Sequence, residues 1–144
     1  MNNIPTSEHF TLEELCRSQV AVCLGIDNEP KRDDIIANLK RLAFHTLEAV
    51  RLLNGNKPIT ITSGYRCKDL NRAVGGVATS QHQCGCAADF IVGSAEENRR
   101  LFQKIKSSGS VPFDQLILEP KAGWIHISYV DGGNRFQIID KSQQ

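Results

Sequence analysis

The chain has 144 residues, of which 40% are hydrophobic and 23% are charged, a composition typical of a soluble globular protein. Its 17 basic and 16 acidic residues leave a formal net charge of +1, so no strong field favours nucleic acid as a partner. No window approaches the roughly 20 apolar residues of a membrane-spanning helix, and we expect no membrane insertion.

The first nine residues, Met1–His9, have neither a basic start nor an apolar run. We therefore expect no secretory signal and synthesis in the cytoplasm. The five cysteines are odd in number, which argues against a disulfide framework and favours reduced thiols. The length and the lack of a linker or repeat predict a single domain over residues 1–144.

The first elements in chain order are helices. Thr11 and Glu14 have the spacing of a capping box, so a short helix is expected there, with Phe10 as its hydrophobic staple. A loop follows through Gly25 to Pro30. Pro30 is suited to a position near the start of a second helix, because its fixed φ matches the first helical turn.

A long core helix is predicted over residues 34–53, because apolar side chains recur there at helical spacing and Asn54-Gly55 supplies a stop. The β-branched segment at residues 59–62 predicts a short strand, followed by a turn at Ser63–Arg66. Residues 68–73 are expected to form a short helix before the Gly75-Gly76 turn.

The second half is predicted to contain most of the strands. We expect strands at residues 86–92, 115–118, 124–129 and 135–139, the last two forming an antiparallel pair around Gly132-Gly133. A capping box at Ser94 opens a helix between the first two of these strands. Helices first and strands late predict an α+β fold, with N-terminal helices packed on a small, mainly antiparallel sheet.

Two separated segments together offer a metal site built from His82, Asp89 and His126. Two imidazoles and one carboxylate leave the fourth tetrahedral position of zinc open for water, which is typical of a catalytic site. In the predicted strand at residues 124–129, His126 lies on the face opposite Ile125 and Ile127 and can point into a cleft.

Other interpretations of the same residues exist. A single histidine such as His82 or His126 is more often hydrogen-bonded or exposed than a ligand, and Asp89 alone could be a turn residue. Thiolates are strong zinc ligands, so Cys84 and Cys86 offer a competing structural site. Their spacing is tight for one metal and no second cysteine pair follows, which favours small buried hydrophobic side chains.

Several motifs together resemble the zinc D-alanyl-D-alanine carboxypeptidase family, whose relatives include phage endolysin peptidases and which shares its fold with Hedgehog signalling domains. These motifs are Ser63-Gly64-Tyr65-Arg66, Leu70-Asn71, Gly75-Gly76, Ser80-x-His82-x-x-Gly85-x-Ala87-x-Asp89 and Trp124-x-His126. The resemblance covers residues 10–136, and it implies the Hedgehog/DD-peptidase type of α+β fold.

The resemblance implies roles for individual residues. It implies that His82, Asp89 and His126 bind Zn²⁺. It implies that Arg66 orients the substrate through a carboxylate or a carbonyl oxygen, which suits the fixed donors of a guanidinium. Ser80 is a further candidate for substrate binding, with a simple turn as its alternative role, and so is Trp124.

The catalytic base is expected to be Glu119. Many family members place an acid three residues before the last histidine, where this chain has Gly123. Glu119 is the nearest acid upstream, in an arrangement similar to the Hedgehog type, and Asp114 is the alternative. Pro120 favours an extended backbone at Glu119, as for a residue at the end of a strand.

The resemblance therefore implies a zinc peptidase that cleaves bacterial cell-wall peptide beside a D-amino acid, and we expect the protein to be a monomer. Its expected partner is a peptidoglycan stem peptide or crossbridge. With no signal, release to the wall during phage lysis through a partner-made pore is one expected route. The alternative is a zinc-containing binding module, or a virion part, that does not cleave, because fold alone does not decide activity.

Overall fold

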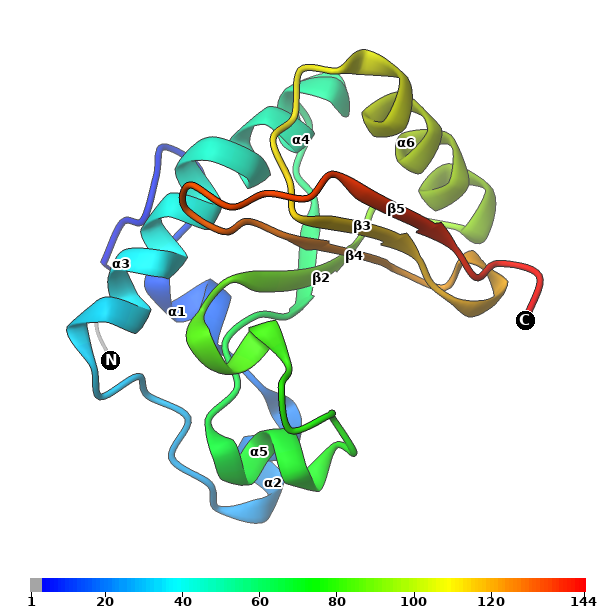
Figure 1. The fold of residues 1–144 in the computed structure, drawn as a ribbon. Helices are drawn as coiled ribbons and strands as arrows, with labels where there is room; N and C mark the ends of the chain where they lie inside the picture. Colours follow the sequence, from blue (N-terminus) through cyan, green and yellow to red (C-terminus); the bar gives the residue numbers. More distant parts are fainter. Residues whose placement is uncertain (1–3) are drawn as a thin grey trace.

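The computed structural model describes residues 4–144 as one five-stranded sheet with helices packed against it (Figure 1). The helices are α1 (Leu12–Cys16), α2 (Gln19–Leu24), α3 (Asp33–Arg41), α4 (Glu48–Leu53), α5 (Lys68–Ala73) and α6 (Ala95–Ser108), with shorter or wider turns η1 (Leu42–Leu47), η2 (Gln81–Cys84) and η3 (Pro120–Ala122). The strands are β1 (Thr60–Ser63), β2 (Ala87–Ile91), β3 (Gln115–Leu118), β4 (Ile125–Ser128) and β5 (Gln137–Asp140), in the spatial order β1-β2-β4-β3-β5. The predicted α+β fold is confirmed.

The register of the sheet brings one residue from each of four strands into a row. Asp89 of β2 pairs with His126 of β4, and His126 pairs with Ile117 of β3. On the other side, Ser63 of β1 pairs with Asp89 after a shift in register that follows Ile61. Directly paired residues point to the same face of a sheet. Ser63, Asp89, His126 and Ile117 therefore form a row across that face.

The opposite face of the sheet forms the core. The alternate residues of the strands lie there fully buried: Ala88, Phe90, Leu116, Leu118, Ile125 and Ile127. Figure 1 shows α3, α4 and α6 covering this side of the sheet, and α2 and α5 beyond the other side. Because the long helices occupy the core face, they do not cover the row that contains Asp89 and His126.

The predicted long helix is confirmed, and it has an irregular centre. Helical backbone runs through α3, η1 and α4, but the six residues of η1 adopt the wider π-helical geometry. The Thr46 hydroxyl, fully buried in this segment, donates to the carbonyl of Pro112 at 2.6 Å. Pro30 does not begin the helix, because Arg32 is its N-cap residue.

The structure has a short helix that the sequence analysis treated as loop. In α2 the Ser18 hydroxyl accepts a hydrogen bond from the backbone of Ala21, and Gly25 ends the helix in the left-handed conformation, with φ of 67°. Ser as N-cap and Gly just after the last turn are ordinary helix boundaries. The sequence contains both boundary residues, Ser18 and Gly25, but α2 is too short to show a clear apolar period.

The predicted pairing of the last strand is wrong. β5 does not pair with β4; it lies parallel to β3, with Gln115 opposite Gln137. The physical cause is Asp114, just before β3. Its carboxylate accepts hydrogen bonds from the backbone and the guanidinium of Arg135, and its carbonyl accepts one from Gln137. These contacts fix the incoming chain beside β3.

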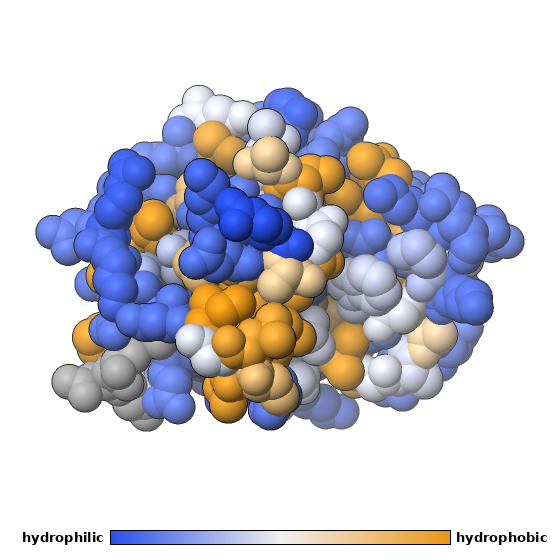
Figure 2. Space-filling view, turned by 90° about the horizontal axis from the view of Figure 1, so that it is seen from below, coloured by the Kyte–Doolittle hydropathy of each residue, from blue (hydrophilic) through white to orange (hydrophobic). Residues whose placement is uncertain are grey.

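The face away from the long helices is mainly hydrophilic and carries several apolar areas. Figure 2 views the molecule from this side and shows the largest of these areas near the lower centre of the view. Among the exposed apolar residues of the chain, Val20, Val22 and Leu24 belong to α2 and Val74 ends α5. Within residues 4–144, every helix is too short or too polar to span a bilayer.

Asn28 joins three segments that support the metal-binding region. Its amide nitrogen donates to the carbonyls of Cys16 and Tyr65, both at 2.9 Å, and its oxygen accepts from the backbone of Cys67 at 2.7 Å. The side chain is buried. The amide therefore ties the end of α1 to the segment that carries Arg66.

We expect Asn28→Ala to lower the free energy of unfolding by about 2–4 kcal/mol, because it leaves three backbone groups without partners. Urea denaturation in the presence of a chelator measures this without a contribution from metal binding. The control is Glu29→Ala, an exposed neighbour, which should change stability by less than about 0.5 kcal/mol. Equal stability of the two variants would contradict the structural role of Asn28.

Candidate metal and catalytic site

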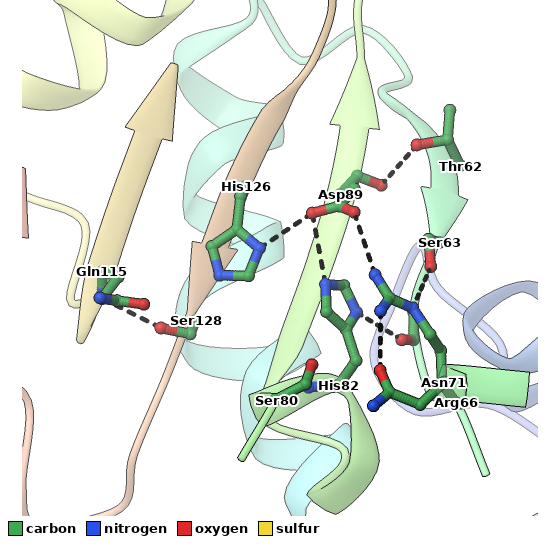
Figure 3. Close-up of polar contacts among 11 residues, drawn as sticks. Thr62, Ser63, Arg66, Asn71, Ser80, His82, Asp89, Gln115, His126 and Ser128 are labelled. Carbon is green, nitrogen blue, oxygen red and sulfur yellow. Dashed lines mark hydrogen bonds and ion pairs between the residues drawn. The ribbon is translucent and has the colours of Figure 1, made fainter. Parts of the chain in front are cut away.

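Three potential ligands converge on one point of the sheet. The Oδ1 atom of Asp89 lies 2.9 Å from Nδ1 of His126 and 3.4 Å from Nε2 of His82. One donor atom from each residue can be chosen so that all three lie within 4.8 Å of one another. The histidines come from η2 and β4 and the aspartate from β2, as Figure 3 shows. The structure thus brings together the three predicted ligands.

A backbone carbonyl orients the His82 ring. Nδ1 of His82 lies 2.7 Å from the carbonyl oxygen of Gly64 and donates to it, which leaves the lone pair of Nε2 directed at the site. Gly64 has to be glycine, since a Cβ there would lie 2.1 Å from the carbonyl oxygen of Leu15. The next residue, Tyr65, donates its N–H to the same Leu15 oxygen at 2.7 Å.

Asp89 is a buried carboxylate that stays ionised. Burial alone would raise the pKa of this carboxyl, but the imidazoles of His126 and His82 beside Oδ1 hold it well below its ordinary value. Arg66 adds a positive charge 3.7 Å from Oδ2. A buried anion with unshared lone pairs, flanked by two imidazoles, is the kind of donor set that a divalent metal completes.

Arg66 is held by the protein on every side. Its Nε donates to the Ser63 hydroxyl at 3.2 Å, Nη1 donates to Oδ1 of Asn71 at 2.9 Å, and Nη2 faces Asp89 (Figure 3). Asn71 is buried and also donates to the carbonyl of Val77 at 2.9 Å. The guanidinium therefore fixes the orientation of Asp89 as well as lining the surface beside it.

Ser80 has the turn role that the sequence analysis gave as its alternative. Its hydroxyl accepts a hydrogen bond from the backbone of His82 at 3.2 Å and begins the η2 turn. The turn ends at Gly85, which has φ of 78°. Ser80 also lines the space beside His126, so the structure is compatible with both of its expected roles.

Glu119 lies immediately after β3 with an extended backbone, φ −78° and ψ 172°, as Pro120 predicts. No side-chain hydrogen bond or ion pair to its carboxylate is found within residues 4–144. Burial raises the pKa of this carboxyl, although the nearby charges of His126 and Lys141 act in the opposite direction. Glu119 is a half-buried, unpaired acid beside a candidate metal ligand.

Trp124 lies across the η3 turn from Glu119. Its carbonyl accepts a hydrogen bond from the backbone of Glu119 at 3.0 Å, and its side chain is 37% exposed. β4 begins one residue later, at Ile125. Trp124 thus closes the turn that presents Glu119, and its part in binding substrate stays a prediction.

Asp114, the alternative base, is already fully engaged. Hydrogen bonds from Arg135 hold the pKa of its carboxyl at about 2, against the opposing effect of burial, and Gln81 donates to it at 2.9 Å. Its side chain is only 2% exposed. A carboxylate bound to a guanidinium in this way is a poor proton acceptor. Of the two acids, Glu119 is the one that can exchange protons.

Two grooves flank the three converging residues. One, which we call the Arg66 groove, has a volume of about 320 Å³ and is lined by Val20, Thr62, Ser63, Arg66, Leu70 and Val74. The other, the Glu119 groove, has a volume of about 490 Å³ and is lined by Ser80, Gln115, Ile117, Glu119, His126 and Arg135. The site is therefore open to a ligand larger than a single residue.

The cysteines do not join the metal-binding cluster. All five thiols are free, and within residues 4–144 the only close group of three potential ligands consists of His82, Asp89 and His126. Cys86 is buried, in agreement with the expectation of a small hydrophobic side chain, whereas Cys84 is exposed. The Cys84 sulfur donates to the carbonyl of Gln81 at 3.3 Å.

Several supporting residues were not assigned by the sequence analysis. Gly64 and Asn71 stood inside quoted motifs without a role, and their functions depend on contacts with Leu15 and Arg66 that no local pattern reveals. The ion pair of Asp114 and Arg135 spans 21 residues. Its only sequence signal was the presence of an acid and a base at the starts of two predicted strands.

Comparison with known proteins agrees with this geometry. A stretch of 48 residues, 33% of this chain, is 46% identical to the zinc D-Ala-D-Ala carboxypeptidase of Streptomyces albus G. The matched stretch spans 19% of the length of that protein. The family model described as Peptidase M15 matches residues 8–128, which include every residue of the candidate site. The chain belongs to the peptidase M15 family.

Proposed function

We propose that this protein is a zinc-dependent peptidase that hydrolyses a bacterial cell-wall peptide beside a D-amino acid. One observation carries the proposal: three ligand atoms lie within 4.8 Å of one another, and one of the three residues, His126, lines a groove together with the unpaired carboxylate of Glu119. A metal site next to a free acid is the arrangement that metal-assisted hydrolysis needs.

Zinc is the metal of this proposal, with His82, Asp89 and His126 as its ligands. Two imidazole nitrogens and one carboxylate oxygen are the ligand types of catalytic zinc sites. The relative from Streptomyces albus G is named as a zinc enzyme, which supports the same choice. When bound, zinc acts as a Lewis acid and lowers the pKa of a coordinated water towards neutrality.

In the proposed mechanism Glu119 moves the protons. Its carboxylate accepts a proton from the water that attacks the peptide carbonyl and donates it to the amine nitrogen as the C–N bond breaks. The water oxygen stays on the new carboxyl group. The raised pKa of the Glu119 carboxyl and its lack of an ion-pair partner suit a group that both accepts and releases a proton.

Arg66 and Ser80 are proposed to contact the substrate. Arg66 has five N–H donors and can direct one of them to a carbonyl oxygen while it holds Asp89. The Ser80 hydroxyl lies in the Glu119 groove and can bond the peptide backbone. Trp124, next to the catalytic turn, is proposed as an apolar contact for a substrate side chain.

The substrate class follows from the relative, which is named for its action on D-Ala-D-Ala. We propose a peptidoglycan stem peptide or crossbridge as the substrate of this chain. Action on the wall during phage lysis, after synthesis in the cytoplasm and release through a pore, is part of the same proposal. The test is mass spectrometry of purified muropeptides incubated with zinc-loaded protein.

Cleavage of a muropeptide beside a D-amino acid would support the proposal. The absence of any new fragment, in a sample that holds one zinc per chain, would favour a binding module of the same fold. The metal content has to be measured in the same sample, because apoprotein would give the same negative result.

We expect Glu119→Gln to retain zinc and to lose turnover by about 10²–10⁴-fold, because the amide cannot accept the proton of the attacking water. Atomic emission measures the zinc, and the muropeptide assay measures kcat. Glu96→Gln, on the exposed first turn of α6, is the matched control and should keep wild-type activity. An active Glu119→Gln enzyme would remove Glu119 from the mechanism.

We expect His126→Ala to weaken zinc binding by at least about 100-fold, since it removes one of three protein ligands. Competition with a chromophoric chelator measures the affinity. His45→Ala is the control, because His45 is exposed on η1 and stacks on Tyr129 away from the ligand cluster. Unchanged zinc affinity in His126→Ala would exclude this histidine as a ligand.

A further inference from the structure

We infer that this chain is an endopeptidase: its site takes a peptide that continues on both sides of the bond to be cut. The inference rests on the proposed function and concerns which peptide that same site accepts. A carboxypeptidase needs a closed end with a group that binds the terminal carboxylate. The two grooves and the pairing of their charges give the site neither feature.

The first observation is the row of paired residues on the open face of the sheet. Ser63, Asp89, His126 and Ile117 follow one another across β1, β2, β4 and β3. Neighbouring strands lie about 4.8 Å apart, so the row is about 14 Å long, the length of about four extended residues. Two of the three candidate metal ligands, Asp89 and His126, occupy the middle of the row.

The second observation is that both ends of the row open into a groove. Ser63 lines the Arg66 groove at one end, and Ile117 lines the Glu119 groove at the other. Arg66 connects the first groove to Asp89, and His126 belongs to the second. A peptide bound across the row can therefore extend past the metal ligands in both directions.

The third observation is that neither groove offers an unpaired cation. Among residues 4–144, Arg66 is the only cationic side chain that lines its groove, and its three nitrogens face Ser63, Asn71 and Asp89. Within the same part of the chain, Arg135 is the only lysine or arginine of the Glu119 groove, and Nε and Nη2 of its guanidinium bind Asp114 at 2.9 and 2.7 Å. The guanidinium N–H groups that would bind a terminal carboxylate already face oxygen atoms of the protein.

The remaining lining residues disfavour a negatively charged chain end. Val20, Leu70 and Val74 make much of the Arg66 groove apolar, and an unpaired carboxylate is costly to bury there. In the other groove, Glu119 is itself an unpaired carboxylate that repels a second one. A continuing peptide carries neutral amides at these positions and avoids both penalties.

The test uses two pairs of synthetic stem peptides with the zinc-loaded full chain. In one pair the peptide ends in D-Ala-D-Ala as the free acid or as the C-terminal amide. In the other pair, one stem peptide is crosslinked and one is extended by two residues beyond the expected bond. Mass spectrometry identifies the bond cut, and initial rates give kcat/KM for each peptide.

We expect the amide to be cut within about tenfold of the acid, and the extended peptide to be the better substrate. A site that depends on a terminal carboxylate would instead lose on the order of 10⁴-fold on amidation. That result would overturn the inference and leave the proposed function intact. No cleavage of any peptide by protein with one zinc per chain would overturn both.

A variant pair tests the Arg66 groove itself. Val20→Trp fills the groove from α2 and should lower kcat/KM for the extended peptide by about tenfold or more, mainly through KM. Val22→Trp is the control, because Val22 is more exposed on the same helix and does not line the groove. Equal activity of the two variants on the extended peptide would overturn the proposed path.

Discussion

The buried carboxylate of Asp89 is the group on which the rest of the site depends. A carboxylate removed from water is stable only where opposite charges and hydrogen-bond donors surround it. Here His126 and His82 approach one oxygen and Arg66 approaches the other. The β2–β4 register, the η2 turn and the β1 bulge each deliver one of these partners.

The two acids that flank β3, Asp114 and Glu119, have different roles. Asp114 precedes the strand and is saturated by Arg135 and Gln81, so it stabilises the attachment of β5. Glu119 follows the strand and has no such partners within residues 4–144, so its carboxylate is free to accept and release a proton. Four residues of β-structure thus lie between a carboxylate used for folding and one available for reaction.

Local sequence patterns predicted most helices and strands, because the formation of each of these elements depends on residues that are close in sequence. The Ser94 capping box, the β3 strand and the long helix are all confirmed. The position of β5 could not be predicted, because it depends on the distant ion pair between Asp114 and Arg135. The three ligand candidates were found by motif, yet the orientation of His82 depends on the Gly64 carbonyl, a backbone contact with no side-chain signature.

The close contact at Gly64 makes the first helix part of the metal site. The Leu15 carbonyl at the end of α1 binds Tyr65 and leaves no room for a side chain at Gly64, whose own carbonyl holds His82. A fragment that began after α1 would retain all three ligands but lose the support that fixes one of their rings. The smallest transplantable version of this site therefore includes Leu12–Cys16, about 70 residues before the first ligand.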